Sequence, residues 1–244
     1  MPTFFESHLE PNIDEIRLSP PEAHHAVKVL RLQKGDQVRV ANGRGLIAHG
    51  RLVEAQSRHT RVRLEHYQQI PKEAPRRVLA VAPPKSAERT DWIVEKATEL
   101  DVDRLVFLHT DRLEKRRIKM ERLEAKAVSA LKQCGRAWLP VIVAMTGLDT
   151  WLEQAASPGM SLLSAHCGHQ NRKPLWEAIP QGGPATLIVG PEGDFSDREI
   201  RLMEAHGAQS IDLGPLILRT ETAALAALAQ LILLQERPHP ECTY

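Results

Sequence analysis

The residues that could do chemistry gather in two stretches of the second half of the chain. Leu187–Ile200 reads LIVGPEGDFSDREI, and Leu213–Leu228 reads LGPLILRTETAALAAL. In both, an apolar run leads into a glycine–proline turn, and a segment typical of a helix follows. A glycine turn of this kind often cradles a phosphate, because backbone N–H groups at a helix N-terminus attract anions.

Neither stretch has a phosphate-binding spacing. The dinucleotide fingerprint requires GxGxxG at the first strand–helix turn, and the P-loop requires GxxxxGK[ST]. Gly190–Gly193 lacks both spacings and the lysine, it follows a late strand, and Glu192 would repel an anion. We expect the two turns to lie at adjacent strand ends and to form a pocket of main-chain N–H and C=O groups. Such a pocket favours an uncharged group such as adenine, although two tight turns without a ligand remain an alternative.

The second half of the chain alternates strands with helices. Apolar runs predict strands at 78–84, 104–110, 140–145, 160–166, 185–190 and 210–214. Helical patterns occupy 90–100, 118–133, 196–207 and 222–235, with Thr220 or Thr222 able to cap the last helix. Apolar strands separated by helices predict an α/β fold, with a mostly parallel sheet covered on both faces.

The first part of the chain follows a different pattern. Period-two alternation at 37–42, 47–55 and 60–66 is interrupted by turn signals, and a helix that begins at its prolines is expected over 21–31. These features predict a small antiparallel β-barrel or sandwich. The stretch QQIPKEAPRR reads as a linker, so we expect two domains, 1–72 and 76–244.

Composition limits the compartment and the partners. The 244 residues are 42% hydrophobic and 26% charged, as in an ordinary soluble globular protein. Three cysteines without a CxxC pattern argue against a disulfide scaffold and favour a reducing cytosol. The N-terminus does not resemble a signal peptide, and the longest apolar run is too short to span a bilayer. We expect a cytoplasmic protein that does not act at a membrane.

Charge is unevenly distributed along the chain, although the net charge is only +1. Residues 1–72 hold 11 Lys or Arg against 8 Asp or Glu, and Arg112–Arg136 hold 9 basic and 3 acidic residues. A basic block can be a phosphate-binding face or simply a solvated helix, and both interpretations stay open. Aromatic residues are scarce, which argues against a nucleic-acid surface built on stacked rings.

Taken together, GPEGDFS and LGPLILRTETAALAAL resemble the signature of the RsmE family, S-adenosylmethionine-dependent methyltransferases of ribosomal RNA. The similarity extends over nearly the whole chain. HHAVKVLRLQKGDQVRVANGRG resembles the family's N-terminal PUA-like RNA-binding part. PPKSAERTDWIVEKATEL resembles the first strand and helix of the catalytic domain, and QCGRAWLP resembles its middle.

The resemblance implies a fold and an activity that composition does not show. The implied fold is a C-terminal SPOUT α/β domain with a trefoil knot, preceded by a PUA-like β-barrel. The implied activity is methylation of N3 of one uridine in 16S rRNA of the small ribosomal subunit, with S-adenosylmethionine as donor. The family acts as a homodimer formed through the C-terminal domain.

The resemblance also assigns residues. Backbone groups of three loops would hold the donor, and these loops contain Leu163, His166, Gly190, Pro191, Glu192, Gly193, Leu213, Gly214, Leu218, Thr220, Thr222 and Ala223. The residues expected to bind RNA are Arg31, Arg39, Arg44, Lys85, Arg112 and Arg136, with Arg116 and Arg117 favoured as solvated charge. This chain departs from the family at Asp194 and Asp101, where glycine is usual, and at Lys132, where glutamate is frequent.

Two side chains are candidates for catalysis. Loss of the uracil N3 proton places negative charge on O2 and O4, so a cation there would stabilise the transition state. Arg219 is the first candidate, and its alternative role is an ion pair with Glu192 or Glu221 that fastens two loops. Glu221 could accept the proton, or it could serve the dipole at a helix start.

Three other readings compete with this one. The cluster of His166, Cys167 and His169 suggests zinc, but no second ligand pair accompanies it, so no metal is expected. A knotted 2′-O-ribose methyltransferase of RNA is the nearest rival activity. A protein that binds or assembles rRNA without catalysis is the third, and the intact GPEG and LRTET loops argue against it.

Overall fold

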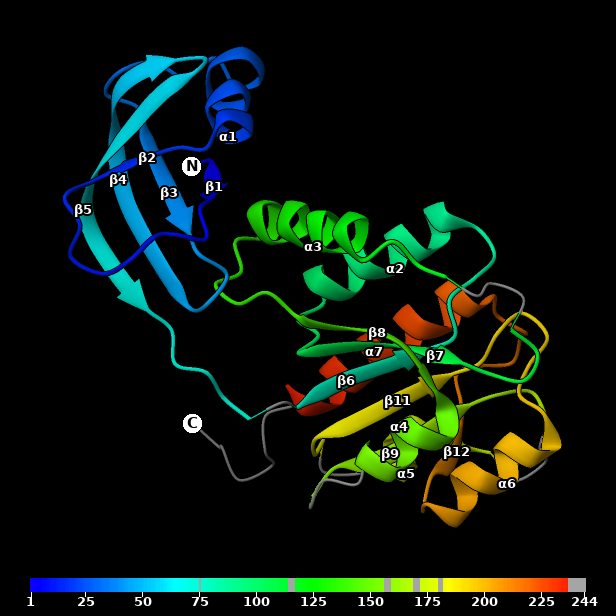
Figure 1. Cartoon of the computed structure of the whole chain (residues 1–244). Helices are drawn as coiled ribbons and strands as arrows, with labels where there is room; N and C mark the ends of the chain where they lie inside the picture. Colours follow the sequence, from blue (N-terminus) through cyan, green and yellow to red (C-terminus); the bar gives the residue numbers. More distant parts are fainter. Residues whose placement is uncertain (75, 114–116, 156–158, 169–171, 180–181, 237–244) are drawn as a thin grey trace, which may run out of the picture. The chain divides into compact units, whose positions relative to one another are not determined.

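A computed structural model describes residues 1–74, 76–113, 117–155, 159–168, 172–179 and 182–236 (Figure 1). The chain forms two compact units. Unit 1 contains Met1–Glu73 together with Ala127–Leu139, and unit 2 contains Ala74–Lys126 and Pro140–Tyr244. The N-terminal unit is therefore not continuous in sequence, and Arg136, which the sequence reading assigned to the second domain, belongs to unit 1.

Unit 1 is built on one five-stranded sheet (Figure 1). In the spatial order β1-β3-β4-β5-β2, its strands are β1 (Thr3–Phe5), β2 (Glu15–Arg17), β3 (Gln37–Ala41), β4 (Leu46–Gln56) and β5 (His59–Gln69). The pairs are antiparallel except for β1 with β3, which is parallel. The alternating runs of the sequence correspond to β3, β4 and β5. The three-residue strands β1 and β2 were not predicted, because they are too short to show a period.

The helix expected over 21–31 has two parts. It begins as α1 (Pro20–His24), with prolines in its first turn, and continues as a π-helix, η1 (His25–Val29). Ala23 and Ala26 are buried in the core of unit 1, where Phe4, Leu18 and Val40 lie with them. The short side chains of the two alanines let this helix pack closely on the sheet.

Residues 127–139 complete unit 1. Leu131 and Ala137 form a second buried cluster with Ala41 and Ile47 of the sheet. The Trp138 indole N–H donates to the carbonyl of Ile70 at 3.1 Å. Burial of these apolar side chains explains why this segment belongs to unit 1 rather than to the unit that surrounds it in sequence.

Lys132, the residue at which the family frequently has glutamate, makes an ion pair in unit 1. Its Nζ lies 2.6 Å from Oε1 of Glu22, a buried residue of α1. A glutamate at position 132 would place two carboxylates against each other. In this chain, the lysine at position 132 is therefore complementary in charge to Glu22, its partner.

Unit 2 is built on a seven-stranded, fully parallel sheet. Its strands are β6 (Arg77–Val81), β7 (Arg104–His109), β8 (Val141–Gly147), β9 (Ser161–Ala165), β10 (Lys173–Pro174), β11 (Ala185–Val189) and β12 (Gln209–Asp212), in the spatial order β10-β12-β9-β11-β6-β7-β8. The central strands are apolar on both sides and buried, as every residue of β11 illustrates. The predicted α/β fold with a parallel sheet is confirmed.

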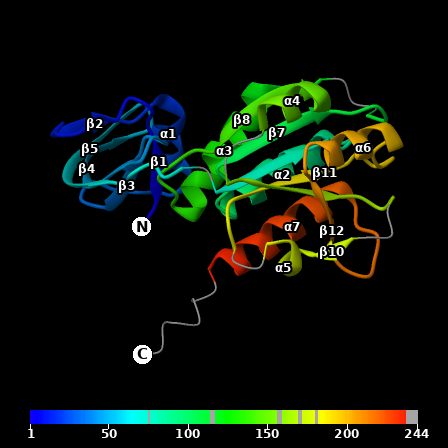
Figure 2. The same cartoon turned by 90° about the horizontal axis from the view of Figure 1, so that it is seen from below.

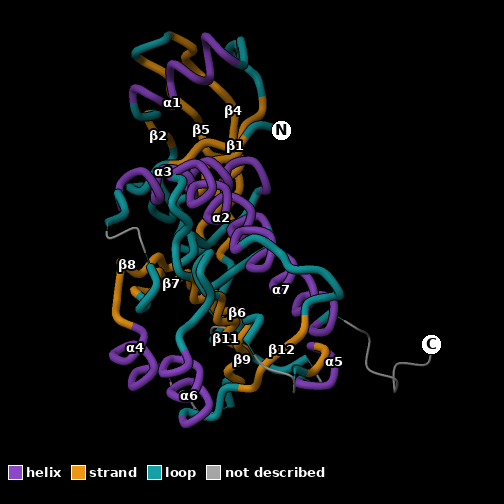
Figure 3. The backbone as a smooth tube through the Cα atoms, turned by 90° about the vertical axis from the view of Figure 1, so that its right-hand side faces the viewer, coloured by secondary structure: helices purple, strands orange, loops and turns teal. Residues whose placement is uncertain are grey.

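Helices cover both faces of this sheet, α2, α5 and α7 on one and α4 and α6 on the other (Figure 3). The helices of the chain beyond α1 are α2 (Ala87–Glu99), α3 (Met120–Cys134), α4 (Leu148–Ala155), α5 (Leu175–Ala178), α6 (Asp197–Ala205) and α7 (Thr220–Gln235). The short helix α5 lies beside α7 (Figure 2). The sequence patterns did not predict the helices α4 and α5.

The last helix, α7, is apolar on nearly every side. Ala224, Leu228 and Leu231 are buried on the sheet side, while Leu233 is 67% exposed on the outer side. A helix that is hydrophobic all round normally requires a partner on each face. Among the described residues, no helix combines the length and the apolar character needed to cross a membrane.

Candidate active site

Three parallel strands of unit 2 end at the same level of the sheet. Val189 at the end of β11 pairs with Ala165 at the end of β9, and Ile211 of β12 pairs with the same Ala165. The loops that follow the three strands therefore meet at the carboxyl edge, where open α/β sheets bind ligands. The sequence reading placed the two glycine turns at adjacent strand ends. In the structure β9 lies between them, so its loop forms a third wall.

A cavity of about 340 Å³ opens among these loops. Nine of the residues expected to hold the donor line it, together with Arg219: His166, Gly190, Pro191, Glu192, Leu213, Gly214, Leu218, Thr220 and Ala223. Leu163, Gly193, Glu221 and Thr222 are not part of the lining. Leu163 is a fully buried residue of β9, and Gly193 lies against the side chain of Arg112.

The loop 190–194 is fastened to three other parts of unit 2. The Thr220 hydroxyl donates to the Gly190 carbonyl at 3.1 Å, and the Arg112 guanidinium donates to the Gly193 carbonyl at 3.0 Å. The backbone N–H of Cys167 donates to the Asp194 carboxylate at 3.0 Å. Because the bonds come from α7, from the segment after β7 and from the segment after β9, they fix the loop relative to both other walls.

Asp194, which has no evident role in the sequence, makes one of these bonds and forms a turn. Its backbone is left-handed, with φ of 61°, a conformation that glycine adopts freely and that Asp tolerates better than most residues. One carboxylate oxygen accepts from Cys167 and the other accepts from its neighbour Phe195 at 2.9 Å. Aspartate thus takes the glycine-like backbone conformation and adds two hydrogen bonds.

Gly190 is required for a close contact within the same loop. A Cβ at this position would lie 3.0 Å from the ring of Phe195, which is 2% exposed and belongs to the core beneath. Any side chain would push the loop away from that core. Glycine is favoured at position 214 for a different reason: the φ of 140° there lies in the region that favours glycine.

Arg89, and not Arg219, makes the ion pairs with Glu192 and Glu221. From the first turn of α2, its Nη1 lies 3.2 Å from Glu192, and its Nε lies 3.4 Å from Glu221. Arg219 is exposed at the cavity, and its guanidinium makes no hydrogen bond or ion pair with a described residue. The alternative in which Arg219 fastens the two loops is therefore wrong for this structure.

The start of α7 differs from the expectation for its cap. Arg219 is the N-cap residue and makes no side-chain cap bond, while Thr220 is the first helical residue and Thr222 is exposed. The Thr220 hydroxyl bonds the Gly190 carbonyl instead of an N–H group of its own helix. Glu221 is buried in the first turn, where a carboxylate is favoured by the helix dipole.

His166 and Arg172 contribute to the wall formed after β9. The His166 ring is buried and its Nε2 lies 2.9 Å from the Ser210 hydroxyl of β12. Arg172 is exposed at the cavity and donates to the His166 carbonyl at 3.4 Å. The sequence reading included His166 but missed Arg172, because a single arginine beyond a strand carries no local signal.

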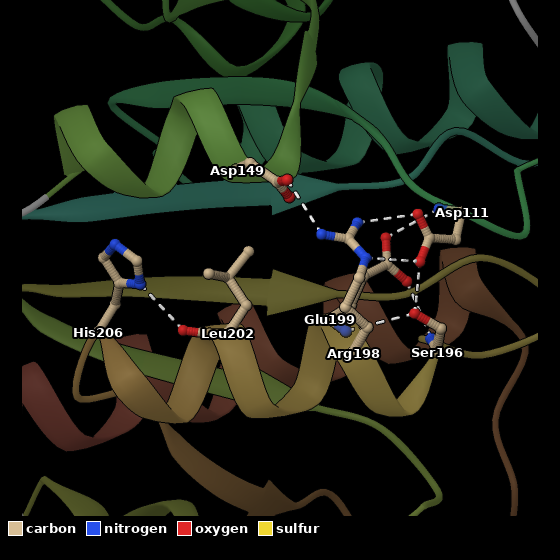
Figure 4. A network of polar contacts seen from close by, with 7 residues as sticks. All are labelled: Asp111, Asp149, Ser196, Arg198, Glu199, Leu202 and His206. Atoms are coloured by element: carbon tan, nitrogen blue, oxygen red, sulfur yellow. Dashed lines mark hydrogen bonds and ion pairs between the residues drawn. The ribbon is translucent and has the colours of Figure 1, made fainter.

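A polar network fixes the segment that carries Arg112 (Figure 4). Glu199, fully buried in α6, accepts from the N–H of Asp111 at 2.8 Å and from the N–H of Ser196 at 2.9 Å. Ser196 and Glu199 form a capping box at the start of α6. The Arg198 guanidinium, followed by the Ser196 hydroxyl, lowers the pKa of the Asp111 carboxyl below its ordinary value.

The residues expected to bind RNA are distributed over both units. In unit 1, Arg31 is exposed with φ of 55°, Arg44 donates to the Ser7 carbonyl at 2.7 Å, and Arg136 is half-buried. Arg39 donates to the Thr3 hydroxyl at 3.0 Å and packs against Gly135. In unit 2, Lys85, Arg112 and Arg117 are exposed.

Two further candidates of the sequence reading, Arg116 and His169, lie outside the described residues. Among the residues that are described, no group of three or more His, Cys, Asp or Glu side chains is arranged to hold a metal ion.

Comparison with known proteins places this site in a family. Residues 72–232 match the family model described as an RNA methyltransferase domain, and residues 18–65 match the RNA methyltransferase PUA domain. A protein of Synechocystis named "Ribosomal RNA small subunit methyltransferase E" is 33% identical over 228 residues, 91% of this chain and 74% of its own. The chain belongs to the ribosomal RNA small subunit methyltransferase E family. The resemblance seen in the glycine loops is confirmed.

Solved structures similar to this chain share its fold. Ribosomal RNA small subunit methyltransferase E of Neisseria gonorrhoeae, bound to S-adenosylmethionine, superposes with a TM-score of 0.85 at 25% identity, covering 96% of this chain and 98% of that one. A Legionella pneumophila protein in complex with the cofactor SAM superposes with a TM-score of 0.81 at 28% identity, covering 94% and 96%.

Proposed function

We propose that the protein is an S-adenosylmethionine-dependent methyltransferase that modifies N3 of one uridine in 16S rRNA of the small ribosomal subunit. The observation that carries the proposal is the cavity at the three strand ends, which is built from the loops that place the chain in its family. Two solved structures to which this chain is similar contain this cofactor, one of them a member of the family. The substrate places the reaction in the cytoplasm.

The lining of the cavity fits this donor. Its acidic side chains, Glu192, Asp194 and Asp212, suit a ligand with a sulfonium and an ammonium group, whereas they would repel a polyphosphate. Gly214 leaves backbone groups accessible, and Leu213 and Leu218 offer apolar surface for an adenine ring. A volume of about 340 Å³ is within the range of small-molecule pockets.

S-adenosylmethionine, when bound there, supplies an electrophilic methyl group. The protein's part is to hold the uracil edge in line with that methyl and to stabilise the charge that develops when N3 loses its proton. Arg219 is the residue for the second task, because it is exposed at the cavity and no described side chain neutralises it. Glu221 lies beside Arg89 and outside the lining, so we assign it to the start of α7 rather than to proton acceptance.

We further propose the trefoil knot that the family resemblance implies. The chain leaves β12 near the edge of the sheet, and α7 then packs beneath β11 and β6 at its centre. Near the end of α7, the Leu234 carbonyl would lie 2.4 Å from a Cβ at Gly182, so the 182–184 segment closes tightly over the helix. Both observations support a C-terminal helix drawn through a loop.

A homodimer is proposed on the outer face of α7 and the loop before it. Leu216 and Ile217 are 77% and 86% exposed, and Leu233 is also exposed. Exposed apolar side chains before the start of α7 and near its end favour an interaction surface along this helix. Sedimentation of the purified protein should give twice the mass of the chain, and replacement of Ile217 and Leu233 by lysine should shift it to the monomer.

Recognition of RNA is assigned to both units. Unit 1 corresponds to the PUA-like RNA-binding domain and unit 2 to the methyltransferase domain. Arg31, Arg44 and Arg136 of unit 1 and Lys85 and Arg112 of unit 2 would contact phosphates, which place the substrate without reading its sequence. The base itself would be turned out of its stack into the cavity. Arg39 is held by unit 1, so we rank it below the others.

One experiment tests the activity against its rivals. The purified protein is incubated with radiolabelled S-adenosylmethionine and either 30S subunits lacking the modification or free 16S rRNA, and the labelled nucleoside is mapped. We expect N3-methyluridine at one position. Label on a ribose would show the 2′-O activity instead. Tight binding of the donor without transfer to either substrate would indicate a binding or assembly protein.

A further inference from the structure

Arg89 connects two walls of the cavity through their carboxylates. Glu192 belongs to the loop 190–194, and Glu221 belongs to the first turn of α7, directly after Arg219 and Thr220. The two glutamates approach different nitrogens of one guanidinium, Nη1 and Nε. A planar guanidinium can hold two acceptors in fixed directions, which a single ammonium cannot do equally well.

The pair with Glu221 is the more buried of the two connections. The Glu221 side chain is 11% exposed, against 39% for Glu192, so solvent screens it less. Among the described residues, Arg89 is the one cation within ion-pair distance of Glu221, and Oε2 of Glu221 is buried without a hydrogen-bond partner. Removal of Arg89 would leave this buried carboxylate uncompensated, which is strongly unfavourable.

We infer that Arg89 is a positioning residue of the donor site: by holding Glu192 and Glu221 together, it sets the distance between the loop 190–194 and the start of α7. Arg89 does not line the cavity, so it acts through the two glutamates and not on the ligand. The inference rests on the proposed function in one respect: S-adenosylmethionine is taken as the ligand of the cavity. Its affinity then changes when the distance between the two walls changes.

A double-mutant cycle tests the inference. The variants are R89M, E192Q, E221Q and the doubles R89M/E192Q and R89M/E221Q, with R201M as control because Arg201 is an exposed arginine of α6 outside the cavity. Calorimetric titration with S-adenosylmethionine gives Kd for each. We expect R89M to weaken binding about tenfold. R89M/E221Q should bind no more weakly than R89M alone, whereas Glu192 also lines the cavity, so its coupling to Arg89 should be smaller. R201M should bind like the wild type.

A conservative variant separates geometry from charge. R89K keeps the charge but can place its nitrogen near only one glutamate at a time, so we expect it to restore part of the affinity lost in R89M. Independent effects of R89M and the glutamate variants, or an unchanged Kd in R89M and E192Q, would overturn the inference. Glu192 also lines the cavity, so E192Q is informative only through its coupling with R89M, and R89K is the variant that remains informative where R89M does not fold.

Hydrogen exchange of the protein without ligand keeps this test distinct from that of the proposed function. If Arg89 holds the walls, amides of 190–194 and 219–223 exchange faster in R89M than in the wild type, while those of α6 do not change. A wild type that fails to bind S-adenosylmethionine would contradict the proposed function alone. Equal exchange in R89M and the wild type would contradict the role of Arg89 whatever the ligand is.

Discussion

The side chain of Arg219 differs from those of Arg89 and Arg112 in the same region. Arg89 is held by carboxylates and Arg112 by a carbonyl, whereas the Arg219 guanidinium has no hydrogen bond or ion pair with a described residue. An arginine held by the protein contributes to structure, whereas an unneutralised one at a cavity can stabilise developing charge. Arg219→Ala should therefore lower kcat roughly 100-fold or more, while the donor Kd changes less than about threefold. Single-turnover kinetics and calorimetry measure the two quantities, and a collapse of donor binding would make Arg219 structural.

Asp194 offers a second prediction for a single residue. Asp194→Ala keeps the left-handed backbone but loses both hydrogen bonds, so it should lower the free energy of unfolding by about 1–2 kcal/mol. Asp194→Gly also loses both hydrogen bonds but relieves the backbone strain, so its free energy of unfolding should fall by less. Denaturant titration compares the two, and equal losses would show that the backbone conformation contributes little.

Glu6 gives a prediction for pH. Its side chain is 3% exposed, and burial, only partly offset by a hydrogen bond from the Ser19 N–H, raises the pKa of its carboxyl above 4.5. A raised pKa in the folded protein means that folding becomes less favourable as the carboxyl ionises, so this contribution is lost as pH rises. The free energy of unfolding of Glu6→Gln, relative to that of the wild type at the same pH, should therefore be higher at pH 8 than at pH 5. Thermal melts at both pH values measure this, and a difference independent of pH would contradict it.

At the scale of elements, the start of α6 holds the segment after β7. Glu199→Ala removes the acceptor for two partly buried backbone N–H groups and half of the capping box. It should lower the free energy of unfolding by about 2–3 kcal/mol, from the lost cap and the unsatisfied N–H groups together. Glu204→Ala, at an exposed position of the same helix, is the matched control and should change it by less than about 0.5 kcal/mol. Similar losses in both variants would contradict the role of the network.

The elements that the sequence predicted are those with long, regular patterns. The apolar runs that became β6, β7, β9 and β11 and the long alanine- and leucine-rich run that became α7 all lie where they were expected. The strands β1, β2 and β10 and the helix α5 have only two to four residues each, too few for a period to be recognised. The order of strands was equally hidden, because sequence does not show that β9 lies between β11 and β12.

The candidate site was predictable as loops but not as contacts. The residues of GPE (190–192) and of LRT (218–220) line one cavity, while Gly193 and Glu221 do not; glycine–proline turns and threonines leave a pattern that sequence shows. Arg89 was missed because its partner Glu192 is 103 residues away and its charge resembles that of any exposed helical arginine. The same limit applies to Glu221 as a candidate base. The sequence shows that it is two residues from Arg219, but not that its side chain is directed toward Arg89 of α2.

At the scale of the whole molecule, unit 1 depends on a segment from the middle of the chain. A fragment of residues 1–73 lacks Leu131, Ala137 and Trp138, so Ala41 and Ile47 lose their cover. We expect the fragment to be less stable by roughly 2 kcal/mol or more than the same residues joined through a flexible linker to residues 127–139. Circular dichroism during heating compares them. Leu131→Asp in the joined form is the control, and it should melt like the fragment.

The interleaving of the units also decides how the protein can be cut and recombined. The chain passes from one unit to the other three times, after Glu73, after Lys126 and after Leu139. A protease that cleaves the linker near residue 73 therefore leaves the two units covalently joined. For the same reason, an N-terminal module from a relative cannot be exchanged as one cassette. A chimera that keeps its RNA-binding unit intact must carry two separate pieces of the donor sequence.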